Sequence, residues 1–313
     1  MKLISLLLLV ILSASVAQAE SGLAFDSALG VTSNADLSAT NTVGDRIFTV
    51  GGVYRFNSKQ SAMRAALKYT DYAKSIENDL LSVDFGTSWK SHDKDQNAPT
   101  YSLKSILRHY LHNAPASTDQ GFTHFGLSAD ANWKLGQSSQ SEWTLGPRIE
   151  LEHYPSYFNR SDVDGSFLFE LSTALTPESN FSVGLTPDLL VSTLSDFSKI
   201  SLMLSLDYDQ MLKQEMSWGA GAYLTPALYL SRLASATSAI VTRSKGKAAQ
   251  STTLLASQKE STFTFSPNLW WSKELSDSFD LRLETSMNIQ KSKSGSYDYS
   301  EIEAFASIHY RVF

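Results

Sequence analysis

Four histidines and a neighbouring carboxylate are the residues to consider first for metal binding or catalysis. His109, His112, His124 and His153 fall within one stretch of the chain, and Glu152 directly precedes the last of them. Imidazole and carboxylate groups bind zinc, and a positioned histidine can activate a nucleophile. Because the spacing matches no specific ligand motif, we expect no metal, no cofactor and no enzymatic activity. The four histidines remain a candidate pH gate, since imidazole gains its charge at about pH 6.5.

Two groups of charged residues could act on a solute in water. The first is basic and the second acidic: Arg64, Lys68, Lys104 and Arg108, then Glu150, Glu152, Glu170 and Asp188. So many ionisable groups cannot lie in a dry core, because each unpaired buried charge is costly. We expect them to face a water-filled interior as two opposed walls, whose field orients polar solutes. The alternative is that they form salt bridges that only maintain the shape of the interior.

Apolar and polar residues alternate along nearly all of the chain after residue 19, and this pattern predicts the strands that position the charges. In 141–154, Trp143 and Leu145 fall on one face while Glu142 and Arg148 fall on the other. Segments of this length cross a membrane as tilted strands. The strands are expected at 23–32, 45–56, 61–70, 79–90, 100–110, 122–135, 141–154, 166–176, 181–191, 199–209, 216–231, 259–271, 278–290 and 299–313. They predict an all-β fold, a transmembrane antiparallel up-and-down β-barrel of fourteen strands, with twelve or sixteen strands as alternatives.

The connections between these segments alternate between short turns and longer loops, as they do in membrane barrels. The longest spans 232–258 and is rich in Ser, Thr and Ala, and it also carries the basic residues Arg232, Arg243, Lys245 and Lys247. Long loops in compact structures are usually functional or disordered. We expect this one to be external. It either folds into the interior as a constriction or stands outside as an extended hairpin that turns near 245–247.

Aromatic residues fall near one end of many strands, on the apolar face. The set is Trp89, Tyr101, Trp133, Trp143, Tyr208, Trp218, Trp271, Phe279 and Tyr310. Such rings sit at the headgroup level of a membrane, so we expect a girdle at the end of the barrel that carries both termini, and we place that end in the periplasm. Four prolines also fall on the apolar face: Pro147, Pro187, Pro226 and Pro267. We interpret them as bulges that curve the wall.

The start of the chain predicts a cleaved signal peptide over 1–19. Lys2 precedes an apolar run over 3–12, and Ala17 and Ala19 are the small residues that a signal peptidase accepts. The apolar run is too short for a membrane-spanning helix, and no later stretch is long enough. The remainder, 20–313, is expected to form a single barrel domain. A net charge of −6 argues against binding to nucleic acid, where a basic patch is expected.

On this pattern the chain resembles the bacterial outer-membrane β-barrel superfamily, and in size and strand number it is similar to monomeric fourteen-stranded porins. The likeness covers all of 20–313. The ending, with Tyr310 and Phe313, resembles the terminal signal that the barrel-assembly machinery reads, although Arg311 stands where an aromatic residue is usual. The resemblance implies a location in the bacterial outer membrane, contact with its lipids and lipopolysaccharide, and insertion by that machinery.

The expected function is passive diffusion of small polar solutes or ions through a charged lumen. Inward acidic residues outnumber inward basic ones, which predicts a weak preference for cations. A monomer is favoured, because no strand shows a polar outer face suited to packing against a copy. The alternative is a surface or export barrel, in which external loops bind a partner and the lumen is incidental.

Overall fold

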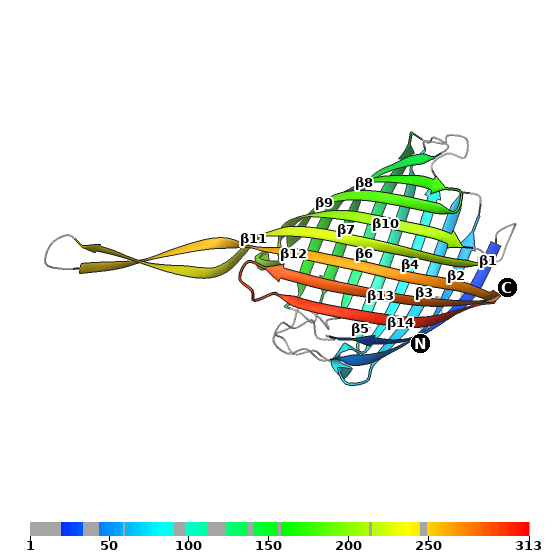
Figure 1. The fold of residues 1–313 in the computed structure, drawn as a ribbon, viewed down its shortest axis with the longest axis horizontal. Helices are drawn as coiled ribbons and strands as arrows, with labels where there is room; N and C mark the ends of the chain where they lie inside the picture. The colour runs from blue at the N-terminus through cyan, green and yellow to red at the C-terminus, as the bar shows by residue number, and fades with distance from the viewer. Residues whose placement is uncertain are drawn as a thin grey trace.

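The computed structural model of the chain is a closed antiparallel β-barrel in which each strand pairs with its neighbours in sequence (Figure 1). The structure describes residues 20–33, 44–58, 60–90, 98–111, 123–136, 140–155, 158–212, 215–244 and 249–312. The barrel closes where β1 pairs with β14, with Leu23 opposite Val312 and Thr32 opposite Glu303. The predicted fourteen-stranded fold is therefore confirmed. The predicted signal peptide over 1–19 and the terminal Phe313 lie outside the described residues.

The strands are long and follow one another with two short 3-10 helices between them. They are β1 (Glu20–Thr32), β2 (Asp45–Asn57), β3 (Ser61–Tyr72), β4 (Leu80–Lys90), β5 (Thr100–Tyr110), β6 (His124–Leu135), β7 (Ser141–Tyr154), β8 (Arg160–Thr176), β9 (Ser179–Ser192), β10 (Lys199–Leu212), β11 (Met216–Ser244), β12 (Ala249–Ser276), β13 (Phe279–Ser292) and β14 (Tyr299–Val312). The helices are η1 (Ile76–Asn78) and η2 (Ser195–Phe197). We call the end of the barrel that carries both chain ends the terminal end. The opposite end, from which β11 and β12 project, is the hairpin end (Figure 1).

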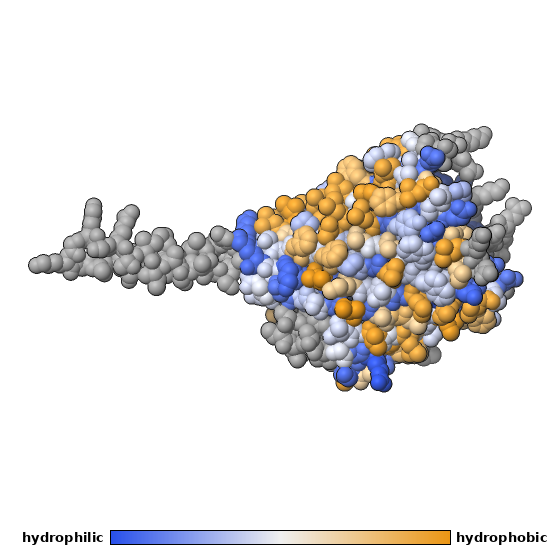
Figure 2. All heavy atoms as spheres, in the orientation of Figure 1, coloured by the Kyte–Doolittle hydropathy of each residue, from blue (hydrophilic) through white to orange (hydrophobic). Residues whose placement is uncertain are grey.

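Successive side chains of a strand point to opposite faces, and in this chain the apolar residues take the outward positions, so the outer wall is apolar. Leu29 is 66% exposed and Ile200 is 51% exposed on the outside, whereas the inward Ile47 is only 3% exposed. Figure 2 shows hydrophobic residues over much of the visible outer wall, with hydrophilic residues at both ends and some between them. In a closed barrel every strand is paired on both edges, so its backbone N–H and C=O groups are hydrogen-bonded, as crossing lipid requires.

The segment predicted as a loop over 232–258 is instead the outer part of two very long strands. β11 and β12 continue past the rim, pair from Leu233 with Lys259 to Ser244 with Ala249, and project away from the barrel (Figure 1). Of the two alternatives for this segment, the described backbone is the extended hairpin and does not enter the lumen. Its Ser- and Thr-rich composition suggested a loop, but β-branched residues such as Ile240 favour a strand. The expected turn at 245–247 lies outside the described residues.

The hairpin meets the barrel at an irregular joint. Leu228 pairs with Ser261 and Leu233 pairs with Lys259, so β11 advances by five residues while β12 advances by two. Extra residues on one strand bend it and increase its twist. The joint therefore separates the pairing of the barrel wall from the pairing of the projecting hairpin.

The four strand prolines do not mark bulges, contrary to our interpretation of the sequence. Beside Pro187, β8 pairs with β9 at Ser166 with Asp188 and again at Phe169 with Leu185, so the register is unchanged and only the partners between are missing. Each of the other three prolines likewise removes backbone pairs to one adjacent strand, without a register shift, and remains paired with the strand on its other side. The reason is that proline lacks an N–H: it removes ladder bonds without inserting a residue.

Candidate functional site

The predicted basic wall lies on neighbouring strands whose pleat turns it toward the lumen. With Arg55 of β2 it forms a set that we call the basic sector: Arg55, Arg64, Lys68, Lys104 and Arg108. Arg64 and Lys104 lie opposite Gly86 from its two sides, in one row across β3, β4 and β5. Lys68 and Arg108 lie opposite Ser82 from its two sides in the same way, nearer the hairpin end. Arg55 is directly opposite Arg64, so two like charges face each other on adjacent strands.

The predicted acidic wall is only partly brought together. Glu150 and Glu152 lie on β7, and Asp188 lies two strands away on β9, where its Oδ2 accepts a hydrogen bond of 2.7 Å from Ser201 Oγ. Glu170 is separated from them, because it pairs with Thr144 much nearer the terminal end of β7 and β8. Three of the four predicted members of the acidic wall therefore lie at a similar height along the barrel axis, and Glu170 lies nearer the terminal end.

Two lumenal aspartates were missed by sequence reasoning. Asp162 lies opposite Glu152, and Asp164 lies opposite Glu150. Both were assigned to an external loop, because β8 begins at Arg160 rather than at the expected residue 166. The available signal was the period-two spacing of Asp162 and Asp164. It was weak because the opposite face of this stretch carries few apolar residues.

A cavity of about 650 Å³ opens where the basic sector meets the carboxylates of β7. Its charged lining consists of Arg55, Arg64, Lys104, Arg108 and Arg148, with Asp84, Glu150 and Glu152. Gly86 leaves space in this cavity, because an added Cβ atom there would make only an ordinary contact of 3.6 Å with Cγ of Lys104. Gly126 instead accommodates Ile106, whose Cγ2 would lie only 2.8 Å from an added Cβ atom. We call this space the lumenal pocket.

Cations of the lumen differ in whether a carboxylate compensates them. Outside the basic sector the ion pairs are close: Lys134 with Glu142 at 2.6 Å, Arg148 with Glu150 at 2.5 Å, Arg282 with Glu284 at 3.2 Å and Arg311 with Asp280 at 2.5 Å. Within the basic sector, Lys104 approaches Asp130 only to 3.9 Å. Among the residues that the structure describes, Arg55, Arg64 and Arg108 form no ion pair. Close ion pairs therefore do not neutralise these three arginines, although Asp84 lines the same space and Lys68 interacts electrostatically with Glu303.

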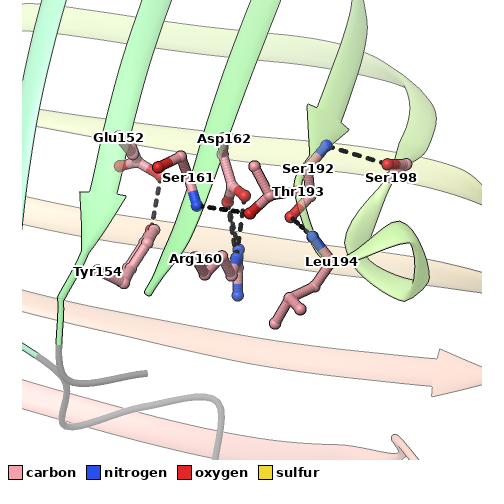
Figure 3. A network of polar contacts seen from close by, with 9 residues as sticks. All are labelled: Glu152, Tyr154, Arg160, Ser161, Asp162, Ser192, Thr193, Leu194 and Ser198. Atoms are coloured by element: carbon pink, nitrogen blue, oxygen red, sulfur yellow. Dashed lines mark hydrogen bonds and ion pairs between the residues drawn. The ribbon is translucent and has the colours of Figure 1, made fainter. Parts of the chain in front are cut away.

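At the hairpin end, a buried ion pair ties β8 to its neighbours (Figure 3). The guanidinium of Arg160 donates to both carboxylate oxygens of Asp162, whose side chain is fully buried. The same guanidinium lies 3.9 Å from the ring centroid of Phe197 in η2 and 4.7 Å from that of Tyr154. The Tyr154 hydroxyl donates a 2.6 Å hydrogen bond to Glu152, which connects this network to the edge of the lumenal pocket.

A second arginine occupies the joint of the hairpin. Arg232 is only 9% exposed, and its guanidinium lies 4.4 Å from the ring centroids of Tyr229 and Tyr297 and 5.1 Å from that of Phe197. The rings come from β11, from the connection between β13 and β14, and from η2. Desolvated cation–π contacts of this kind are favourable. The cluster therefore fixes the joint to two neighbouring connections.

The candidate pH gate is not assembled on one face. His124 is 6% exposed, lies on the lumenal face of β6 and packs against the Tyr154 ring at 5.0 Å. His109 and His153 have the opposite phase, where their Nδ1 atoms lie 3.1 Å from Thr123 Oγ1 and 3.0 Å from Ser161 Oγ. His112 lies outside the described residues. No cluster of three metal-binding side chains occurs in the described part of the chain.

The predicted aromatic set lies toward the terminal end of its strands. Trp89 stacks on Tyr101 with centroids 5.9 Å apart, and Phe279 stacks on Tyr310 at 4.7 Å. Tyr208 and Trp218 contact at 5.2 Å, and Trp218 is opposite Trp271. Trp133 and Trp143 lie on the paired ends of β6 and β7, each opposite a leucine. A role in contacting headgroups remains a prediction.

Closure, strand number and an apolar outer wall together define the architecture. The chain has the fold of an outer-membrane β-barrel. No protein-family model and no curated protein sequence matches it.

Among solved structures, a loop-deletion mutant of OmpT, an outer-membrane protein of Vibrio cholerae, has a TM-score of 0.47 and 6% identity, covering 95% of this chain and 100% of that one. The NanC porin has a TM-score of 0.45 and 9% identity over 91% of this chain and 98% of its own. The KdgM porin, in complex with disordered oligogalacturonate, has a TM-score of 0.39 and 8% identity over 93% and 99%. Likeness this distant carries no inference about solutes or binding residues.

Proposed function

We propose that this barrel is a channel through which small polar solutes or ions cross the bacterial outer membrane by passive diffusion, and that it is not an enzyme. The observation that carries the proposal is the basic sector inside a closed barrel, whose arginines form no ion pair with a described residue. Unpaired charges are too costly for a dry interior, so their presence supports a lumen filled with water. Opposed charged walls act on a solute by orienting it, which requires no reacting group.

The proposed orientation places both termini in the periplasm and the hairpin outside the cell, with the barrel acting as a monomer in contact with outer-membrane lipids and lipopolysaccharide. Short connections and aromatic rings gather at the terminal end, and the longest strands project from the other end. Short periplasmic turns and interfacial aromatic rings are typical of such barrels. Insertion by the barrel-assembly machinery belongs to the same proposal.

The test is the current carried by the purified chain in a planar bilayer. Under a KCl gradient the reversal potential should show a weak preference for K⁺, because inward carboxylates outnumber inward cations in the strand assignment and Asp164, opposite Glu150, adds to them. High salt should reduce the preference by screening. Absence of any current would refute the channel, and a clear preference for Cl⁻ would refute the charge assignment alone.

A second candidate is a surface barrel whose hairpin binds an anionic partner. It is supported by the projection of the hairpin, whose segment carries Arg243, Lys245, Lys247 and Lys259, while the chain has no Asp or Glu between 216 and 259. Deleting 238–252 separates the two functions. Loss of binding to lipopolysaccharide vesicles with unchanged current would assign the hairpin to binding and leave the channel in place.

A further inference from the structure

The lumenal pocket has the chemistry of a binding site rather than of a plain channel wall. Three of its arginines, Arg55, Arg64 and Arg108, are exposed to the lumen and form no ion pair with a described residue. Arg55 and Arg64 are directly opposite on β2 and β3, and like charges in that relation destabilise a sheet. Four other cations of the lumen each lie 2.5–3.2 Å from a carboxylate: Lys134, Arg148, Arg282 and Arg311. No ion pair with a described carboxylate offsets the repulsion between Arg55 and Arg64.

We infer that the pocket binds an anionic, hydroxyl-bearing solute, an inference that rests on the proposed channel and names its substrate class. Guanidinium groups form paired hydrogen bonds with carboxylate or phosphate oxygens, so one such group would relieve the repulsion between Arg55 and Arg64. Arg108 and Lys104 lie on the same wall to hold a second oxygen group.

The other side of the pocket determines how the solute is oriented. Glu150 and Glu152 line it there, and each already accepts one bond within the chain, from Arg148 and from the Tyr154 hydroxyl. Their remaining lone pairs accept hydrogen bonds from hydroxyl groups and repel a second anionic group. The anionic end therefore faces β2–β5 and the hydroxylated end faces β7. A volume of about 650 Å³ lies within the range of ordinary small-molecule sites.

Small residues keep the site open. Gly86 and Ser102 line the pocket on the basic side, and Gly126 and Ser128 of β6 lie between that side and β7. At Gly86 the space is free, because an added Cβ atom would meet nothing closer than the 3.6 Å contact with Cγ of Lys104. A larger side chain at this position would fill the pocket without changing its charge.

The experiment compares three hexose derivatives of different charge as blockers of the KCl current in a planar bilayer: glucose 6-phosphate, glucose and glucosamine. The native chain should be blocked by glucose 6-phosphate at a concentration at least about tenfold lower than by glucose, with glucosamine weakest. Arg55→Gln with Arg64→Gln should abolish the difference. Arg55→Lys with Arg64→Lys should restore part of it, because charge remains while the paired geometry is lost.

Two further variants separate the pocket from the general charge of the lumen. Lys90→Gln with Lys199→Gln removes the same charge from residues outside the pocket lining and should retain the native discrimination. Gly86→Leu should weaken block by glucose 6-phosphate with all charges in place. The site would be overturned if Lys90→Gln with Lys199→Gln lost as much discrimination between glucose 6-phosphate and glucose as Arg55→Gln with Arg64→Gln does. Equal block by the two solutes in the native chain would also overturn it.

The channel and the site fail in different ways. A conducting native chain without discrimination refutes the site and leaves the channel. If the native chain carries no current, equilibrium dialysis of glucose 6-phosphate against the detergent-solubilised barrel decides the site by itself. Binding that Arg55→Gln with Arg64→Gln removes would support it, and absence of binding would overturn it.

Discussion

Replacing Arg232 by Gln should release the joint between the hairpin and the barrel. The guanidinium is 9% exposed and faces three rings with centroids at 4.4, 4.4 and 5.1 Å. A desolvated cation–π contact contributes up to about 2 kcal/mol, and contacts that share one cation do not add fully. We expect a loss of about 2–4 kcal/mol. At about 1.4 kcal/mol for each factor of ten, the equilibrium between a fixed and a released joint would shift by roughly 30- to 700-fold.

The assay is the distance between two spin labels on introduced cysteines, since the chain has no cysteine of its own. Thr242→Cys places one label on the hairpin, and Leu111→Cys places the other beside the rim. The distance distribution should be narrow in the parent, broad with Arg232→Gln and intermediate with Arg232→Lys. Arg243→Gln, which removes an equal charge beyond the joint, should leave it narrow. A narrow distribution with Arg232→Gln would show that the strand pairing alone orients the hairpin.

Three other predictions concern separate parts of the barrel. Deleting 238–252 should leave single-channel current unchanged, because the described hairpin projects away from the lumen; a larger current would mean that it reaches back. In the connection between β13 and β14, hydrogen bonds from the Ser292 N–H and the Lys291 ammonium hold the pKa of Asp298 below its usual 3.8. The lowered pKa stabilises the connection above pH 3.8, and this contribution is lost as the pH falls through the pKa of Asp298. Asp298→Asn should therefore already lack, at pH 7, the protection from hydrogen exchange (measured relative to the intrinsic exchange rate at each pH) that we expect the native chain to lose only in acid. Equal exchange in both chains at pH 7 would contradict this. A double-mutant cycle of Trp89→Ala and Tyr101→Ala should give a coupling of about 0.5–1.5 kcal/mol in barrel unfolding, and no coupling would mean that their stacking is incidental.

Strand number and face could be predicted from the sequence because both follow from period-two alternation with an apolar outer wall. Residues that face lipid, such as Leu29 and Ile200, must be apolar, so an apolar residue at every second position indicates which face of the strand points outward. The pattern fails where lipid no longer imposes it. β8 extends to Arg160 and the hairpin strands extend to Ser244 and Ala249, all beyond the apolar band. There the sequence no longer alternates with an apolar residue at every second position, so these ends were predicted as loops.

The site could be predicted in composition but not in arrangement. The basic wall follows from alternation on β3 and β5, and the row through Gly86 follows from register. Ion pairing does not follow, because it depends on side-chain geometry within a few ångströms. The sequence therefore could not distinguish the compensated Arg148 from the uncompensated Arg64. The separation of Glu170 from Glu150 likewise depends on strand register, which a one-dimensional pattern does not contain.

The central claim, that solutes pass along the charged inner wall, is tested most directly by modifying that wall while current flows. Ser102 lines the lumenal pocket, and its neighbour Leu103 is 39% exposed on the outer face. Ser102→Cys and Leu103→Cys each introduce a single thiol into a chain without cysteine. A water-soluble cationic thiol reagent should reduce the single-channel current of Ser102→Cys in discrete steps and leave that of Leu103→Cys and of the native chain unchanged. Equal sensitivity of the two variants, or no current in any of them, would contradict a conducting lumen.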